Sequence, residues 1–74
     1  MMMTRDEFLT EMQDVLQTDE ELSFGTALKE LEEWDSLAVM ATMAFLDKTF
    51  GVKTSMADYI AINTLEDIAV KVGL

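Results

Sequence analysis

A long segment without charge lies near the middle of the chain and limits the folds that the sequence can adopt. Ser36 to Phe50 is rich in helix-forming residues, and no charged residue occurs from Ser36 through Leu46. Asp35 is a favourable N-cap before this segment, and Gly51 after it supplies a left-handed C-terminal stop. A helix that is apolar around most of its circumference is either central in a large protein or offers surface to a partner or ligand.

The chain is too short for the first of these alternatives. With 74 residues it can bury only one modest core, so we expect a single, monomeric domain over residues 1–74. Half of the residues are hydrophobic, which favours a folded globule over disorder. The buried seam of the predicted helix consists of Val39, Met43, Leu46 and Phe50. Its other faces carry Leu37, Met40, Ala41 and Ala44.

A first helix is predicted before this one. Thr4 and Glu7 have the spacing of a capping box, and the helix that begins there ends near Leu16 or Gln17. Its apolar stripe consists of Phe8, Met12, Val15 and Leu16. Residues 18–35 show no clear hydrophobic period, which predicts a long loop. Because this loop is longer than most connections between helices, we expect it to be packed on the core or functional. We expect a short helical turn around 27–31. The expected anchors of the loop in the core are Phe24, Leu28, Leu31 and Trp34.

Two further helices are predicted after Gly51. Ser55 is expected to cap a short helix over 56–61, and Thr64 with Asp67 to cap a last one. The apolar residues of the last helix are Leu65, Ile68, Ala69 and Val72. Short connections favour helices that pack as neighbours. The predicted fold class is therefore all-α: a small four-helix bundle, three main helices plus one short helix, with a long loop between helices 1 and 2.

The charge of the chain is strongly negative and unevenly distributed. Fifteen acids against five bases give a formal charge of −10. Acids cluster between positions 19 and 35, where Lys29 is the only base. Nucleic acids and anionic membrane surfaces would repel such a protein, so we expect partners with basic patches. Since no apolar run approaches the ~18 residues of a membrane span and the first residues show no signal-peptide stretch, we expect the chain to stay in the cytoplasm.

Two reactive residue types are missing. The sequence has no cysteine and no histidine, which excludes disulfides, thiolate nucleophiles, most zinc sites and the usual general base at neutral pH, and we expect no metal site. Paired carboxylates would need a shaped cleft that a domain of this size rarely offers. We therefore expect the chain to be a non-enzyme.

Ser36 is the candidate functional residue. It directly follows the predicted N-cap, so its hydroxyl lies in the first turn of a helix, where free backbone N–H groups and the helix dipole favour an anion. An Asp-Ser-Leu tripeptide by itself is common at helix starts. Here, however, a capped helix and a long acidic loop precede Glu33-Trp34-Asp35-Ser36-Leu37, and an apolar helix ending in Phe50-Gly51 and two closing helices follow it.

Over essentially the whole chain, this pattern resembles the acyl carrier proteins of the phosphopantetheine-attachment family. The resemblance implies that Ser36 receives 4′-phosphopantetheine from coenzyme A through a separate phosphopantetheinyl transferase, with Asp35 and Leu37 as its flanking recognition residues. It also implies that an acyl group is carried as a thioester on the thiol of this arm. The missing cysteine fits such a carrier, because the thiol comes with the cofactor.

The residues after Ser36 differ from the commonest pattern of that family. Bacterial fatty-acid carriers usually have several carboxylates along this helix, whereas here acids resume only at Asp47. We therefore expect acyl-loading and acyl-transferring enzymes to dock through apolar contacts and the preceding loop. The resemblance then favours a specialised fatty-acid, lipid or polyketide-type pathway. The expected contacts with partners or acyl chains are Met40, Ala41, Ala44, Met56, Ile60 and Ile62.

Two alternatives remain open from the sequence. The same chemistry at Ser36 would serve an aminoacyl or peptidyl carrier, including a D-alanyl carrier. A helical interaction module without any cofactor would use Leu37, Met40 and Ala44 as a partner groove. The thioethers of Met40, Met43 and Met56 can adapt to an acyl chain between helices, but they suit an ordinary core as well.

Overall fold

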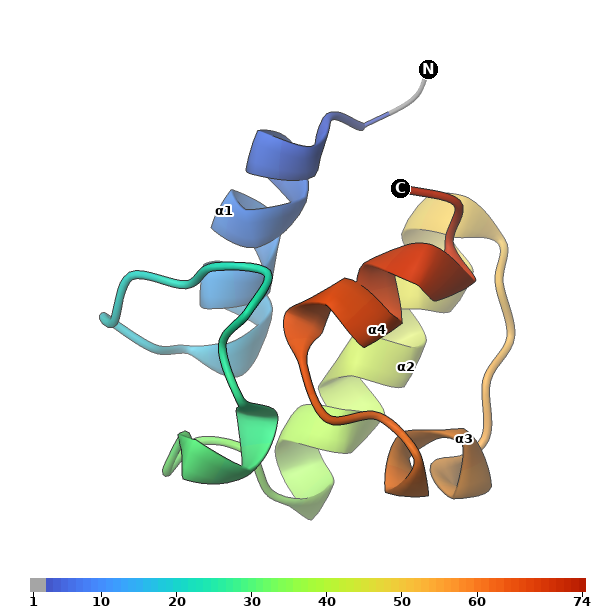
Figure 1. The fold of residues 1–74 in the computed structure, drawn as a ribbon. Helices are drawn as coiled ribbons and strands as arrows, with labels where there is room; N and C mark the ends of the chain where they lie inside the picture. Colours follow the sequence, from blue (N-terminus) through green and yellow to red (C-terminus); the bar gives the residue numbers. More distant parts are fainter. Residues whose placement is uncertain (1–2) are drawn as a thin grey trace.

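The computed structural model describes residues 3–74 and is all-α (Figure 1). Its elements are α1 (Arg5–Leu16), the one-turn 3₁₀ helix η1 (Leu28–Glu30), α2 (Ser36–Phe50), α3 (Met56–Ile60) and α4 (Leu65–Lys71). The predicted four helices and the long loop between the first two are confirmed. The last helix has seven residues and ends just before Val72. Within residues 3–74, no helix has both the length and the apolar character needed to cross a bilayer.

The helices begin where the sequence places their caps. At α1, the Thr4 backbone N–H donates to the Glu7 carboxylate at 2.9 Å, and the Glu7 N–H donates to the Thr4 hydroxyl at 3.1 Å. Ser55 begins α3, and its N–H donates to the Asp58 carboxylate at 2.7 Å. Ser55 and Asp58 form a capping box, and Thr64 caps α4 with a third one. These bonds satisfy backbone donors that have no partner inside the helix, and so they fix the helix starts.

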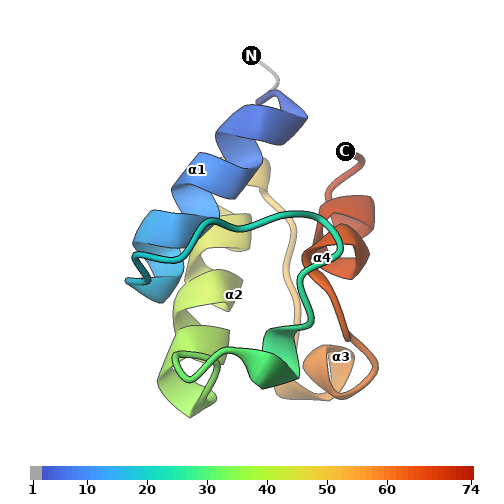
Figure 2. The same ribbon diagram turned by 60° about the vertical axis from the view of Figure 1, so that its left-hand side comes forward.

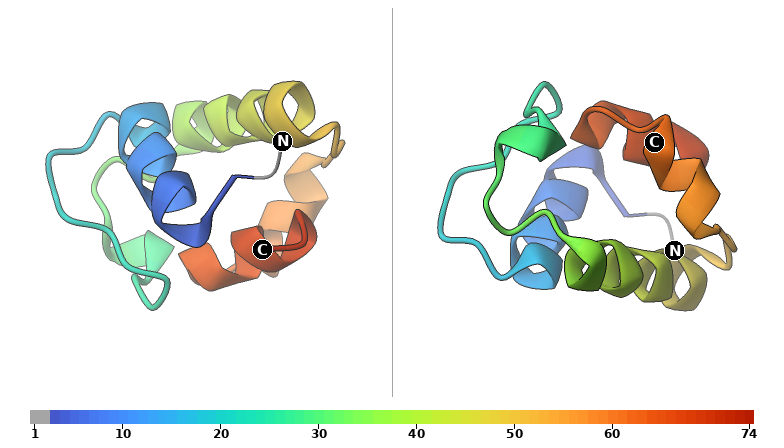
Figure 3. Two further views of the ribbon diagram at one scale, coloured as in Figure 1. Left: turned by 90° about the horizontal axis from the view of Figure 1, so that it is seen from above. Right: turned by 90° about the horizontal axis from the view of Figure 1, so that it is seen from below.

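The four helices surround a central space, as the views from above and below show (Figure 3), and the buried side chains of the core come from all four of them. Phe8 and Met12 of α1 are fully buried there together with Leu46 of α2 and Ile68 of α4. On α1 the predicted stripe is confirmed, with Val15 half-buried. On α2 the predicted seam is partly correct: Val39 and Leu46 are buried, Met43 and Phe50 are half-buried, and Ala38 and Thr42 are buried as well.

The loop between α1 and α2 is packed onto the rest of the fold (Figure 2). The Leu28 N–H donates to the Asn63 carbonyl at 2.9 Å, and the Glu66 N–H donates to the Phe24 carbonyl at 3.0 Å. These bonds join the loop to the α3–α4 connection and to the first turn of α4. Two of the predicted anchors, Leu28 and Leu31, are buried, Phe24 and Trp34 are half-buried, and Leu22 is a further buried residue.

Arg5 connects α1 with two other parts of the fold. Its guanidinium donates to the Glu66 carboxylate of α4 at 2.5 Å and lies 4.0 Å from the centre of the Phe24 ring in the loop. A cation over an aromatic face at an exposed site contributes about 0.5–1 kcal/mol. Arg5 therefore helps to hold α1, the loop and α4 together.

Asp67 makes the stability of the fold depend on pH. Its carboxylate accepts hydrogen bonds from the Asn63 and Thr64 N–H groups at 2.9 and 3.1 Å, which hold its pKa below the ordinary value of 3.8. Because the pKa is lower in the folded state than in the unfolded state, the ionised carboxylate stabilises the fold at pH values above the unfolded-state pKa. This stabilisation is lost as the pH falls through the folded-state pKa.

We therefore predict that Asp67→Asn lowers the melting temperature at neutral pH. The difference from the wild type should shrink as the pH falls below 3.8 and through the lower folded-state pKa of Asp67, because the folded wild type then also becomes uncharged at this position. Thermal denaturation followed by circular dichroism over a series of pH values measures the effect. A difference that stays constant down to the acid limit would contradict the role given to the ionised Asp67.

Candidate functional site

The N-cap residue Asp35 defines the start of α2. Asp35 has an extended backbone, with φ −133° and ψ −171°, and its carboxylate accepts a hydrogen bond from the Ala38 N–H at 2.9 Å. Ser36 is the first helical residue and is exposed. The helix runs for 15 residues to the predicted stop at Gly51, where φ is +69°. The sequence therefore places an accessible hydroxyl at the positive end of a long helix dipole.

This position can carry an anion. The first turn of a helix has backbone N–H groups without an intrahelical partner, and the dipole adds partial positive charge there. Asp35 satisfies the N–H of Ala38. Within residues 3–74, the Ser36 hydroxyl has no hydrogen-bond partner in the structure, so esterification of this oxygen breaks no bond of the fold. A phosphodiester on Ser36 thus fits the residues present.

The segment before Ser36 is held against α3. The rings of Trp34 and Tyr59 lie 6.2 Å apart, centre to centre, at an angle of 46°. The Tyr59 hydroxyl is 2.9 Å from the Thr54 hydroxyl, and burial raises the pKa of Tyr59 above its ordinary value of 10.0. Tyr59 is therefore neutral at physiological pH. This aromatic contact joins the segment that leads into Asp35 and Ser36 to α3.

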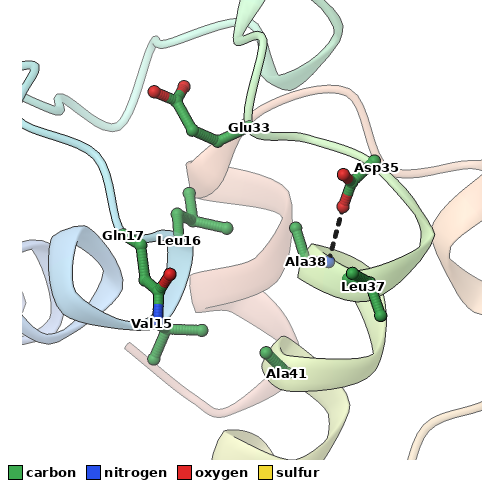
Figure 4. Close-up of a pocket in the computed structure, with 8 residues that line it drawn as sticks. All are labelled: Val15, Leu16, Gln17, Glu33, Asp35, Leu37, Ala38 and Ala41. Carbon is green, nitrogen blue, oxygen red and sulfur yellow. Dashed lines mark hydrogen bonds between the residues drawn. The ribbon is translucent and has the colours of Figure 1, made fainter.

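A pocket of about 400 Å³ lies between the end of α1 and the start of α2 (Figure 4). Both sequence neighbours of Ser36 line the pocket: Asp35, which precedes it, and Leu37, which follows it. Its remaining lining consists of Val15, Leu16, Gln17, Glu33, Ala38 and Ala41. The size falls within the range of small-molecule sites. The pocket thus begins beside the Ser36 backbone.

Exposed apolar side chains gather on α2 and on α3, which contact each other. Leu37 is 74% exposed and Ile60 is 81% exposed, and Met40 and Met56 are also exposed. We call these four residues the apolar surface. In the described part of the chain, the one further large hydrophobic residue with comparable exposure is Val70 on α4. Because four of the five large exposed hydrophobic residues among residues 3–74 lie on these two contacting helices, this surface suits a partner.

The remaining predicted contact residues lie in three different environments. Ala44 is exposed on α2, on the same side as Leu37 and Met40 at helical spacing. Ala41 is exposed as well, but it belongs to the pocket beside α1. Ile62 is only 3% exposed and packs in the core. It therefore lies outside any docking surface and would meet only an acyl chain that enters the bundle.

Comparison with known protein families decides the class of the chain. The family model described as "Phosphopantetheine attachment site" matches residues 6–70. The chain belongs to this family. Its prosthetic group is a covalently attached 4′-phosphopantetheine, so the chain is a phosphopantetheine-bearing carrier domain of the kind that the sequence resembled. No curated protein sequence and no solved structure matches the chain.

The sequence analysis did not identify two residues of the pocket next to this carrier domain's Asp35 and Leu37. Glu33 and Gln17 line the pocket, although they belong to the loop and to the end of α1. Gln17 has a left-handed backbone with φ +53°, a conformation that glycine usually provides at a helix end. The sequence shows that the helix ends there, but it does not indicate which side chains of α1 will face α2.

We predict that the N-cap and the modification residue have separable effects on stability. Asp35→Ala should cost about 1 kcal/mol of unfolding free energy, because it removes the acceptor for the Ala38 N–H. Ser36→Ala should change it by less than about 0.5 kcal/mol, because the residue is exposed and its hydroxyl has no hydrogen-bond partner among residues 3–74. Urea denaturation of the unmodified proteins measures both values. A larger loss in Ser36→Ala would show that the hydroxyl supports the fold.

Proposed function

We propose that the chain is a single-domain acyl carrier protein and that Ser36 carries its 4′-phosphopantetheine arm. The observation that supports this most is the exposed Ser36 hydroxyl at the capped start of α2, in a chain of the phosphopantetheine-attachment family. In the modification, the Ser36 oxygen forms a bond to the phosphorus that bears the pantetheine, and the pyrophosphate bond of coenzyme A breaks, so that adenosine 3′,5′-bisphosphate leaves. A phosphopantetheinyl transferase supplies the base that takes the serine proton. The chain itself acts as a carrier, not as a catalyst.

The cargo that we propose is an acyl group. When bound, the arm supplies the thiol that forms a thioester, which the chain cannot supply because it has no cysteine. The exposed face of α2 carries no acid before Asp47, so partners meet apolar side chains next to Ser36. This favours a dedicated carrier in a specialised fatty-acid, lipid or polyketide-type pathway. An aminoacyl cargo would show itself in the intact mass of protein from the native host.

We propose that the enzymes that act on Ser36 and its arm dock on the apolar surface. Leu37 is the next residue after Ser36, so an enzyme that reaches the serine must also cover this side chain. Aromatic and aliphatic side chains that become buried at the centre of an interface contribute most to binding. The exposed acids of the preceding loop, Glu30 and Glu32, add long-range attraction for a basic partner.

We predict that Ser36 is the one attachment position. Incubation of the purified protein with coenzyme A and a broad-specificity phosphopantetheinyl transferase should add a single phosphopantetheine, seen by intact-mass spectrometry. Ser36→Ala should remain unmodified while keeping the circular dichroism and melting curve of the wild type. Labelling of Ser36→Ala, or a wild type that never gains the mass, would refute the assignment.

We also predict that charge on the apolar surface weakens docking. Met40→Asp should raise the transferase KM for the unmodified protein by about tenfold, because burying one central apolar side chain is worth somewhat more than 1 kcal/mol. Val70→Asp is the matched control, since Val70 is equally exposed but lies on α4. Equal KM values for the two variants would place the docking surface elsewhere.

A further inference from the structure

The helix α3 is held on the fold by few contacts. It consists of Met56–Ile60, and an isolated helix of this length is not stable in water. Tyr59 is its one buried residue, with 6% of its surface exposed. Within residues 3–74, the side-chain hydrogen bonds of α3 stay between positions 54 and 59. The place of α3 on the bundle therefore depends mainly on the packing of Tyr59.

Tyr59 contacts the segment that leads into Ser36. Its ring lies 6.2 Å from the Trp34 ring, centre to centre, at an angle of 46°, within the range of favourable aromatic pairs. Its hydroxyl lies 2.9 Å from the Thr54 hydroxyl, in the connection that enters α3. Trp34 stands two residues before Ser36. The pair of rings thus joins α3 directly to the attachment segment.

The same short helix carries half of the apolar surface. Met56 and Ile60 are exposed on α3, and Leu37 and Met40 are exposed on α2. Both Figure 1 and Figure 2 show α3 at the end of the bundle where α2 begins, which is the Ser36 end. An enzyme that covers Ser36 meets both parts of the surface together only while α3 keeps its place beside α2. Because a few well-packed side chains provide most of the binding energy of an interface, displacement of α3 weakens docking.

We propose that Tyr59 is a positioning residue for the enzymes that act on Ser36. Through its contact with Trp34 it holds α3, and with it the exposed Met56 and Ile60, in a fixed place relative to the start of α2. Tyr59 is buried, so it acts through α3 and not by contact with the enzyme. The inference rests on the attachment proposed at Ser36 and on docking at the apolar surface.

The first test asks whether the ring contact orders α3, and it uses the unmodified protein labelled with nitrogen-15. Trp34→Leu removes the ring contact without changing a residue of α3. NMR relaxation should show the backbone order parameters of α3 falling from about 0.85 to below about 0.6, while those of α1 and α4 stay near 0.85. An α3 that remains rigid in Trp34→Leu overturns the proposal.

The second test measures KM and kcat of a phosphopantetheinyl transferase with the unmodified protein as its substrate. Tyr59→Leu keeps an apolar side chain in the core but loses the ring contact and the hydroxyl bond. KM should rise about tenfold and kcat should stay within about twofold, because docking weakens while the first turn of α2 keeps its cap. Tyr59→Phe keeps the ring contact and should bring KM back to within about threefold of the wild type. An unchanged KM in Tyr59→Leu, or a loss in kcat instead, overturns the positioning role.

Two comparisons separate positioning from lost stability and from direct contact with the enzyme. Ile68→Val destabilises the fold from a fully buried position on α4 and should leave KM within about twofold, at a temperature where all variants are folded. In the double variant Trp34→Leu/Tyr59→Leu, KM should rise no further than in Tyr59→Leu, because both changes remove the same contact. A tenfold rise in Ile68→Val, or a multiplied effect in the double variant, contradicts the proposal.

Failure of this inference can be told apart from failure of the proposed function. A wild type that never gains phosphopantetheine at Ser36 overturns both. A wild type that is modified normally, together with a rigid α3 in Trp34→Leu or an unchanged KM in Tyr59→Leu, overturns the role of Tyr59 and leaves Ser36 as the attachment position.

Discussion

The fold depends on the way the loop between α1 and α2 is fixed to the second half of the chain. A chain of this size buries few side chains, and the loop supplies three of them, Leu22, Leu28 and Leu31. The hydrogen bond from the Leu28 N–H to the Asn63 carbonyl joins this packed segment to the α3–α4 connection. Since the loop leads directly into α2, its anchoring determines where Ser36 stands relative to the other helices. The order of the loop is thus a condition for a defined site.

Local chemistry explains how much of the fold could be predicted. Helix starts depend on a side chain and a backbone N–H within three residues of each other, as at Thr4 and Thr64, so sequence spacing reveals them. The left-handed stop at Gly51 is equally local. The same holds for Ser36, whose place in the first turn follows from Asp35 before it. The buried face of α2 was predicted less well, since Ala38 and Thr42 are buried while Met43 and Phe50 are only half-buried.

The pocket could not be predicted, because it is formed by residues that are distant in sequence. Val15 and Ala41 come together only through the packing of α1 on α2, and the angle of that contact depends on the whole core. Periodicity assigns Ala41 to the outer side of its helix, which is correct, yet it does not show that α1 borders that side. Glu33 has no sequence signal either, since it is one acid among many in the loop.

The contact between Trp34 and Tyr59 has a practical consequence for work on this carrier. Trp34 is the only tryptophan of the chain, stands two residues before Ser36 and is half-buried against a ring of α3. Its emission spectrum therefore responds to the environment of the attachment segment, without interference from other indoles. Changes of state at the serine, including attachment of the arm, loading of a cargo or the arrival of an enzyme, can be followed by the intrinsic fluorescence of the unlabelled protein.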